Sequence, residues 1–135
     1  MMCLVHTQKD ISVKSELKYI ELKSGYSDDG PAWIGYVEYS KTGKTVYFDD
    51  KAFGGKVHGG CSELETGDIY WITGIKEDGN NRHIFGRGVI QIQDTAVEEY
   101  ELLTGISVRG NKDFKVVTMK ATDKKRFEKI LNEKL

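Results

Sequence analysis

The sequence contains few of the residues that cross-link or interrupt a chain. Among 135 residues there is one proline, Pro31, and there are two cysteines, Cys3 and Cys61, which is too few for a disulfide framework. No apolar run approaches the roughly 18 residues of a membrane span, and the start of the chain lacks the basic and apolar segments of a secretion signal. These absences predict a cytoplasmic protein that does not contact a membrane.

The chain also lacks a strong excess of one charge. Its formal charge is -1, with 39% hydrophobic and 30% charged residues, which is typical of a globular protein and gives no indication of nucleic-acid binding. The distribution is uneven, because residues 94–104 hold four acids and no base, whereas residues 109–135 hold nine bases and four acids. We interpret the basic part as the solvated face of a lysine-rich helix, or alternatively as a basic surface.

Complete cofactor motifs are missing as well. Gly43-Lys44-Thr45 has the end of a phosphate loop, but Glu38 stands where the first glycine is needed. Gly86-Arg87-Gly88 fails as a dinucleotide fingerprint, because Gln91 occupies the third glycine position. We therefore expect no cofactor.

The residues that are present predict one domain. A chain of this length can bury a hydrophobic core, and we expect residues 1–16 to be a mobile leader before a globular domain of residues 17–135. Residues 17–23 are a first strand candidate, and residues 33–39 pair with residues 45–49 across a turn at Thr42-Gly43. The side of this hairpin that is expected to face the core carries Trp33, Gly35, Val37, Tyr39, Val46 and Phe48.

Towards the C-terminus the period becomes helical. Thr95 and Glu98 fit a capping box, and Gly105 fits a helix stop. After a strand candidate at residues 114–119, a last helix is expected from Thr122 or Asp123 onward, with its apolar side formed by Phe127, Ile130, Leu131 and Leu135.

Together these segments predict the fold class. We expect an α+β protein that is mainly antiparallel, either a strongly bent sheet or a small SH3-like or OB-like β-barrel, with two helices in the C-terminal part. Glycines inside strands, such as Gly35 and Gly74, are typical of the bends that a barrel requires.

The most distinctive segment is a predicted β-hairpin from Ile69 to Ile92 with Gly79-Asn80 as its turn. Because side chains alternate along a strand, the register gives the hairpin two faces. The face assigned to the core carries Ile69, Trp71, Thr73, Ile75, Ile84, Gly86, Gly88, Ile90 and Ile92. The opposite face mixes aromatic, cationic and aliphatic side chains, namely Tyr70, Ile72, Gly74, Lys76, His83, Phe85, Arg87, Val89 and Gln91.

This mixed face is the predicted binding surface, because aromatic and arginine side chains contribute most at interfaces. The candidate ligand-binding residues are Tyr70, Lys76, Arg82, His83, Phe85 and Arg87. The alternative interpretation is that a helix from elsewhere in the chain covers the face.

Residues 50–67 hold five of the fifteen glycines and are predicted to form a long loop. The carboxylates in and after this loop, Glu63, Glu65 and Asp68, are candidates for binding a hard cation, although a flexible acidic loop explains them equally well. A zinc site is a further hypothesis, from two closely spaced pairs: Cys3 with His6 and His58 with Cys61.

Part of the chain resembles a known group of sequences. The resemblance lies in residues 18–26, residues 30–35, and residues 65–67 followed by Tyr70-Trp71 and residues 79–83. These stretches are similar to a family of small uncharacterised bacterial proteins. The resemblance implies a bacterial domain that folds independently, and it supplies no catalytic residues.

Three functions are compatible with these patterns. The first is a small binding module without catalysis, which holds a protein or a small anionic ligand on the mixed face and the glycine-rich segment. The second is a hydrolase of phosphodiesters or nucleotides, with His83 as general base and Arg82 and Arg87 as charge stabilisers. The third is a structural protein that forms homo-oligomers through the mixed face.

Overall fold

The structure is a computed structural model, and it describes residues 15–23, 31–57, 60–79 and 88–134. Its strands in chain order are β1 (Ser15–Leu22), β2 (Ala32–Tyr39), β3 (Thr45–Phe48), β4 (Lys51–Val57), β5 (Gly60–Glu63), β6 (Ile69–Gly74), β7 (Ile90–Gln93) and β8 (Phe114–Val117). Between β7 and β8 lie a 3-10 helix, η1 (Asp94–Ala96), and the α-helix α2 (Val97–Thr104). A second α-helix, α3 (Lys125–Lys134), follows β8.

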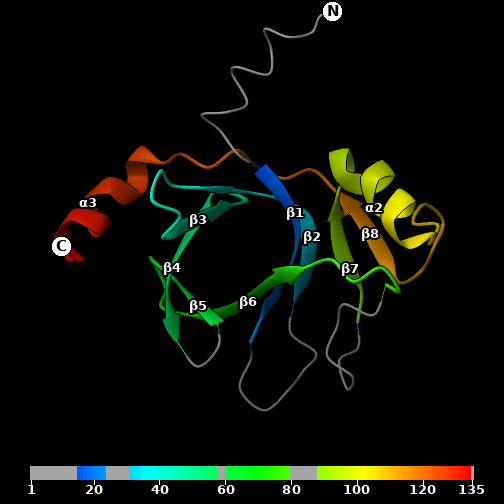
Figure 1. The fold of residues 1–135 in the computed structure, drawn as a ribbon, viewed down its shortest axis with the longest axis horizontal. Coiled ribbons are helices and arrows are strands. Elements are labelled where there is room, and N and C mark those ends of the chain that lie inside the picture. The colour runs from blue at the N-terminus through cyan, green and yellow to red at the C-terminus, as the bar shows by residue number, and fades with distance from the viewer. Residues whose placement is uncertain (1–14, 24–30, 58–59, 80–87, 135) are drawn as a thin grey trace, which may run out of the picture.

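Six of these strands close into an antiparallel barrel (Figure 1). Strands β1 to β6 pair in chain order, and β6 pairs again with β1. Closure satisfies the strand edges that an open sheet would leave unpaired. The predicted α+β class with a small antiparallel barrel and two C-terminal helices is confirmed.

Strands β7 and β8 extend the sheet beyond the barrel. β7 pairs in parallel with the first half of β2, from Ala32 opposite Ile90 to Ile34 opposite Ile92, and β8 pairs in parallel with β7. The second half of β2 pairs with β3 through Glu38 and Tyr39. Since β1 occupies the other side of β2, one edge of β2 is shared by two partners.

The barrel interior holds a hydrophobic cluster formed by alternate residues of the strands. Its buried members are Ile20, Val37, Val46, Phe48, Phe53 and Tyr70, with Trp33, Tyr39, Cys61 and Ile72 among the half-buried residues packed against them. The predicted β2–β3 hairpin and its core-facing side are therefore confirmed.

Two further clusters lie outside the barrel, one under each helix. Val97 and Tyr100 of α2 pack with Tyr19 and with Ile34 and Ile92 of the neighbouring strands. Phe127 of α3, which is 0% exposed, packs on Tyr47 and Ala52. The two helices consequently lie at opposite ends of the molecule (Figure 1).

The predicted hairpin from Ile69 to Ile92 is wrong. β6 pairs with β1 and β5, whereas β7 pairs with β2 and β8. Gly79 does adopt the positive φ of a turn, 79°, but β7 does not pair with β6. Pairing with β1 is favoured because it closes the barrel over five residue pairs, which a local turn signal cannot reveal.

The assignment of faces in β6 is also wrong. Tyr70 is 5% exposed and lies in the barrel interior, while Trp71 is half-buried on the outer side, with Lys23 Nζ 5.4 Å from its ring centroid. Thr73 is exposed. In β7, by contrast, Ile90 and Ile92 are buried as predicted.

The prediction of a long loop at residues 50–67 is also wrong, because most of this segment forms β4 and β5. Two of its glycines occupy strand positions that disfavour a larger residue. Gly55 has a φ of 70° at an irregularity in the β4–β5 ladder, as is typical of a β-bulge. A Cβ on Gly60 would lie 2.6 Å from the carbonyl oxygen of Tyr70, so this position allows a close approach of backbones.

The helices and the last strand largely follow the sequence. Gly105 ends α2 with a φ of 74°, and its N–H donates to the carbonyl oxygen of Glu101 at 2.8 Å. The capping box, however, does not form, because Ala96 is the N-cap residue and no side chain caps the helix. The strand predicted at residues 114–119 is β8, and α3 begins at Lys125, just after the predicted start.

Candidate functional site

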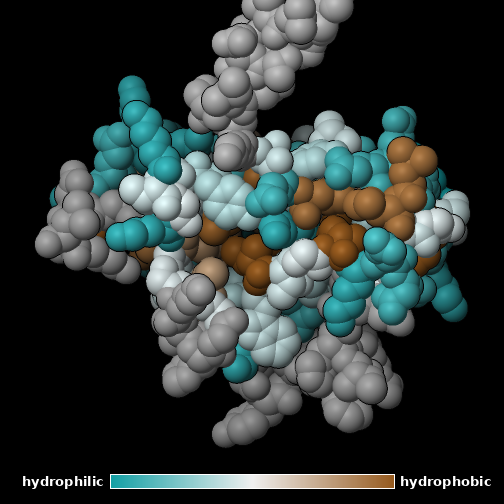
Figure 2. Space-filling view, in the orientation of Figure 1, coloured by the Kyte–Doolittle hydropathy of each residue, from teal (hydrophilic) through white to brown (hydrophobic). Residues whose placement is uncertain are grey.

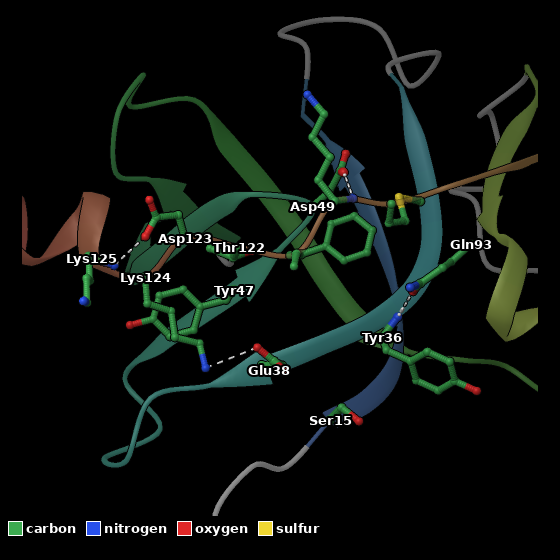
Figure 3. A pocket seen from close by; sticks show the side chains of 14 residues that line it. Ser15, Tyr36, Glu38, Tyr47, Asp49, Gln93, Thr122, Asp123, Lys124 and Lys125 are labelled. Carbon is green, nitrogen blue, oxygen red and sulfur yellow. Dashed lines mark hydrogen bonds and ion pairs between the residues drawn. The ribbon is translucent and has the colours of Figure 1, made fainter.

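A surface groove of about 670 Å³ opens where the edge of β2 passes from β7 to β3. One wall is the segment between β8 and α3, residues 118–124, which we call the strap. The groove, which we call the seam groove, is lined by Ser15, Tyr36, Glu38, Tyr47, Phe48, Asp49, Gln93 and residues 119–125 (Figure 3). Its walls thus come from five separate parts of the chain.

The side chain of Gln93 bonds to β2 between the part of the strand that pairs with β7 and the part that pairs with β3. Its Oε1 accepts the backbone N–H of Tyr36 at 2.8 Å, as Figure 3 shows. A Cβ on Gly35 would lie 2.9 Å from this oxygen and 2.7 Å from the ring of Phe48. Glycine at position 35 therefore lets an amide and an aromatic ring approach the β2 backbone.

The strap is fastened to the tight turn between β3 and β4. Both residues of this turn, Asp49 and Asp50, have positive φ, 48° and 61°, a conformation that aspartate tolerates better than most residues. Asp49 Oδ1 accepts the N–H of Lys120 at 2.9 Å, and the N–H of Asp50 donates to Thr122 Oγ1 at 3.0 Å. These contacts hold the strap as a wall of the groove.

The acidic side chains of the seam groove have partners. Glu38 forms an ion pair with Lys124 at 3.2 Å, and Lys124 Nζ also lies 5.2 Å from the centroid of the Tyr47 ring. Asp49 lies 3.7 Å from Lys51 Nζ in addition to its bond with the strap. Asp123 Oδ1 accepts the backbone N–H of Lys125 at 3.2 Å.

Two cations of the lining lack such partners. In the described part of the chain, neither Lys120 nor Lys125 forms an ion pair through its side chain, although Lys120 lies near enough to Asp50 to attract its carboxylate. The three lysines and three carboxylates of the lining balance in formal charge, but the ammonium groups of Lys120 and Lys125 are not held in an ion pair with a described carboxylate.

Tyr36 separates the seam groove from a second one. Its hydroxyl donates to Glu99 Oε1 of α2 at 2.7 Å, and burial, followed by the Glu99 carboxylate, raises the pKa of Tyr36 to about 12. The second groove, which we call the α2 groove, measures about 380 Å³ and shares Ser15 and Tyr36 with the first. The rest of its lining is Glu16, Leu17, Ile75, Glu99 and Leu103.

None of the ligand-binding residues predicted from the sequence is among the described residues that line the seam groove. Tyr70 is in the barrel interior, where its ring contacts Phe53 edge-on at 4.9 Å between centroids. Lys76 is exposed beyond the end of β6. The other four, Arg82, His83, Phe85 and Arg87, lie outside the described residues. The predicted set as a whole, and catalysis by His83 with it, stay predictions.

Neither helix covers Tyr70, the buried residue of the predicted mixed face. α3 packs on the outer side of β3 and β4, and α2 packs over β2 and β7. Tyr70 is covered by the barrel itself, and burial together with the nearby Glu63 carboxylate raises the pKa of Tyr70 to about 12.

The two metal hypotheses have different outcomes. Cys3, His6 and His58 lie outside the described residues, and Cys61 is half-buried against the barrel interior, so zinc binding stays a prediction. The cation site of Glu63, Glu65 and Asp68 is wrong, since the described residues contain no group of three such ligands that could hold a metal ion. Glu63 is 5% exposed, and Glu65 pairs with Arg126 of α3.

Sequence reasoning missed the seam groove because its residues are distant in the chain. Gln93, Lys120 and Lys125 come from the end of β7, the strap and the start of α3. The pair Asp49-Asp50 after a short strand was a usable turn signal. Nothing in the local pattern, however, indicates that this turn holds the strap.

Comparison of the chain with models of known families, with curated proteins and with solved structures gave no match. The bacterial family resemblance therefore stays a prediction, and function is argued from the geometry of the grooves. In the described part of the chain, no helix has the length and apolar character needed to cross a membrane.

Proposed function

We propose that this chain is a small binding module without catalysis and that its seam groove holds a small anionic ligand. The observation that supports this proposal is the charge state of the lining. Glu38 and Asp49 form ion pairs and Asp123 accepts a backbone N–H, whereas Lys120 and Lys125 form no ion pair among the described residues. A bound anion would accept charge-assisted hydrogen bonds from these two ammonium groups.

Neutral donors and the size of the groove support the same ligand class. Because Gln93 Oε1 accepts the Tyr36 N–H, the NH2 group of the same side chain is left to donate. Ser15 adds a hydroxyl to the lining. A volume of about 670 Å³ lies within the range of small-molecule sites and accommodates a phosphate or a small carboxylate.

The experiment is a titration of the full chain with inorganic pyrophosphate, followed by the backbone amide signals in NMR spectra. We expect shifts concentrated at residues 36–38, 93 and 119–125. The double variant Lys120→Ala/Lys125→Ala should bind roughly tenfold more weakly, since two exposed charge contacts contribute about 1.4 kcal/mol together. Both lysines are on the surface, so the fold should be retained.

The matched control is Lys112→Ala/Lys115→Ala, which removes two exposed charges outside the groove. Equal weakening by both double variants would mean general attraction to a basic surface and would overturn the proposal. Absence of any localised shift at millimolar pyrophosphate would overturn it too. Release of orthophosphate, followed by phosphorus NMR, would contradict binding without catalysis and favour the hydrolase.

A further inference from the structure

The outward face of α2 carries two leucines that the fold does not use for packing. Leu102 is 87% exposed and Leu103 is 46% exposed, while Val97 and Tyr100 of the same helix are buried. Residues four apart share a helical face, so Leu102 lies next to Glu98 and Leu103 next to Glu99 on the helix surface. In Figure 2 hydrophobic surface extends from the centre of the view to its right side, where Figure 1 places α2. Contiguous exposed apolar surface of this kind is typical of interaction sites.

The α2 groove lies beside these leucines. Its apolar lining comes from Leu17 of β1, Ile75 after β6 and Leu103. Its charged lining is acidic, from Glu16 and Glu99, and none of the described residues that line it is basic. Glu98 is exposed on the same helix, in a segment that contains no base.

From this charge complementarity we infer that the α2 groove docks a segment of another protein that is rich in lysine and leucine. Apolar side chains of the segment would cover Leu102 and Leu103, and its cations would meet Glu16, Glu98 and Glu99. Lysine suits such a groove because its alkyl stem lies on apolar surface while its ammonium reaches the carboxylates. An acidic segment or a nucleic acid would be repelled. The inference does not depend on the proposed function, because it uses a different groove, whose described charged residues are both acidic.

The test measures binding of dye-labelled synthetic peptides to the full chain by fluorescence anisotropy. The probe peptide contains lysines and leucines in helical spacing, and two reference peptides replace all lysines by glutamate or all leucines by serine. We expect saturable binding of the probe peptide and at least tenfold weaker binding of both references. Leu102→Ser/Leu103→Ser should weaken binding of the probe at least about tenfold, since two apolar contacts are lost.

Charge reversal by Glu98→Lys should weaken binding as well, whereas two matched controls should not. Val89→Ser changes an apolar residue that is 47% exposed and does not line the groove, and Glu128→Lys reverses an exposed charge on α3. Equal binding of the glutamate peptide, or equal effects of variants and controls, would overturn the inference. Light scattering that shows self-association abolished by Leu102→Ser/Leu103→Ser would assign the groove to a second copy instead.

Discussion

The guanidinium of Arg126 binds both the side chain and the backbone of Asp50. Nη1 lies 2.7 Å from Asp50 Oδ1, and Nη2 donates to the carbonyl oxygen of the same residue. Nε and Nη2 also reach the two carboxylate oxygens of Glu65, at 3.1 and 3.2 Å. One arginine at the start of α3 therefore fastens the helix to the turn before β4 and to the turn after β5.

This fastening predicts that acid releases the strap and α3 before the barrel unfolds. The N–H of Asp123, followed by Arg126, holds the pKa of the Asp50 carboxyl below its usual value. A carboxyl with a lowered folded pKa stabilises the folded state above its unfolded pKa of about 3.9, and this contribution is lost as the pH falls through the folded pKa. Hydrogen-exchange protection of residues 119–130 should then fall while that of β2 and β3 persists.

Replacement of Asp50 should reproduce this loss of hydrogen-exchange protection at neutral pH. Asp50→Asn removes the charge and should leave the strap weakly protected at pH 7, with little further change on acidification. Arg109→Met, which removes an exposed arginine away from the strap, is the control. If the strap and the barrel lost protection together in every case, Arg126 and Asp50 would not act as a separate fastening.

A second prediction concerns two glycines near β6. A Cβ on Gly60 would lie 2.6 Å from the carbonyl oxygen of Tyr70 and 2.9 Å from Ile69 Cγ2, whereas a Cβ on Gly74 would meet nothing within 4 Å. Gly60→Ala should lower the free energy of unfolding by about 1–3 kcal/mol, because the clash is with backbone that cannot move without breaking the β5–β6 pairing. Gly74→Ala should change it by less than about 0.5 kcal/mol. Urea unfolding curves of the two variants measure the difference, and equal destabilisation would contradict the closeness of β5 and β6.

A third prediction concerns alkaline pH. Burial is the first cause that raises the pKa of Tyr36, Tyr39 and Tyr70 to about 12, and the carboxylates of Glu99, Glu16 and Glu63 respectively add to it. A raised folded pKa means that the stabilisation is complete below the unfolded pKa of about 10 and is lost between pH 10 and 12. The free energy of unfolding should decrease over this range.

Absorbance of the phenolate at 295 nm checks this prediction. Part of the signal should appear near pH 12, together with unfolding of the barrel, and Tyr70→Phe should reduce that late part. Complete ionisation of all tyrosines by about pH 10.5 in a folded protein would show that these phenols are not buried.

The elements predicted best are those that depend on neighbouring residues. The β2–β3 hairpin has its alternation and its turn within a short stretch, so periodicity alone assigns Val37, Val46 and Phe48 to the core side, where they lie. In β6 the same reasoning failed, because the side of Tyr70 depends on its pairing with Leu22 of β1 and Cys61 of β5. The candidate grooves could not be predicted for the same reason, since Gln93 and Lys120 are brought together by tertiary contacts.

The amino-acid sequence alone determined the small antiparallel α+β class, the first hairpin with its inner face and the two C-terminal helices. These follow from side-chain periodicity, turn residues and helix stops, which act over a few neighbouring residues. Tertiary structure decided which strands close the barrel, that Gly60 lies in a strand and not in a loop, and where the strap lies. Those outcomes come from pairing and burial between distant segments, and a local pattern carries no information about the partner that a strand or a loop will meet.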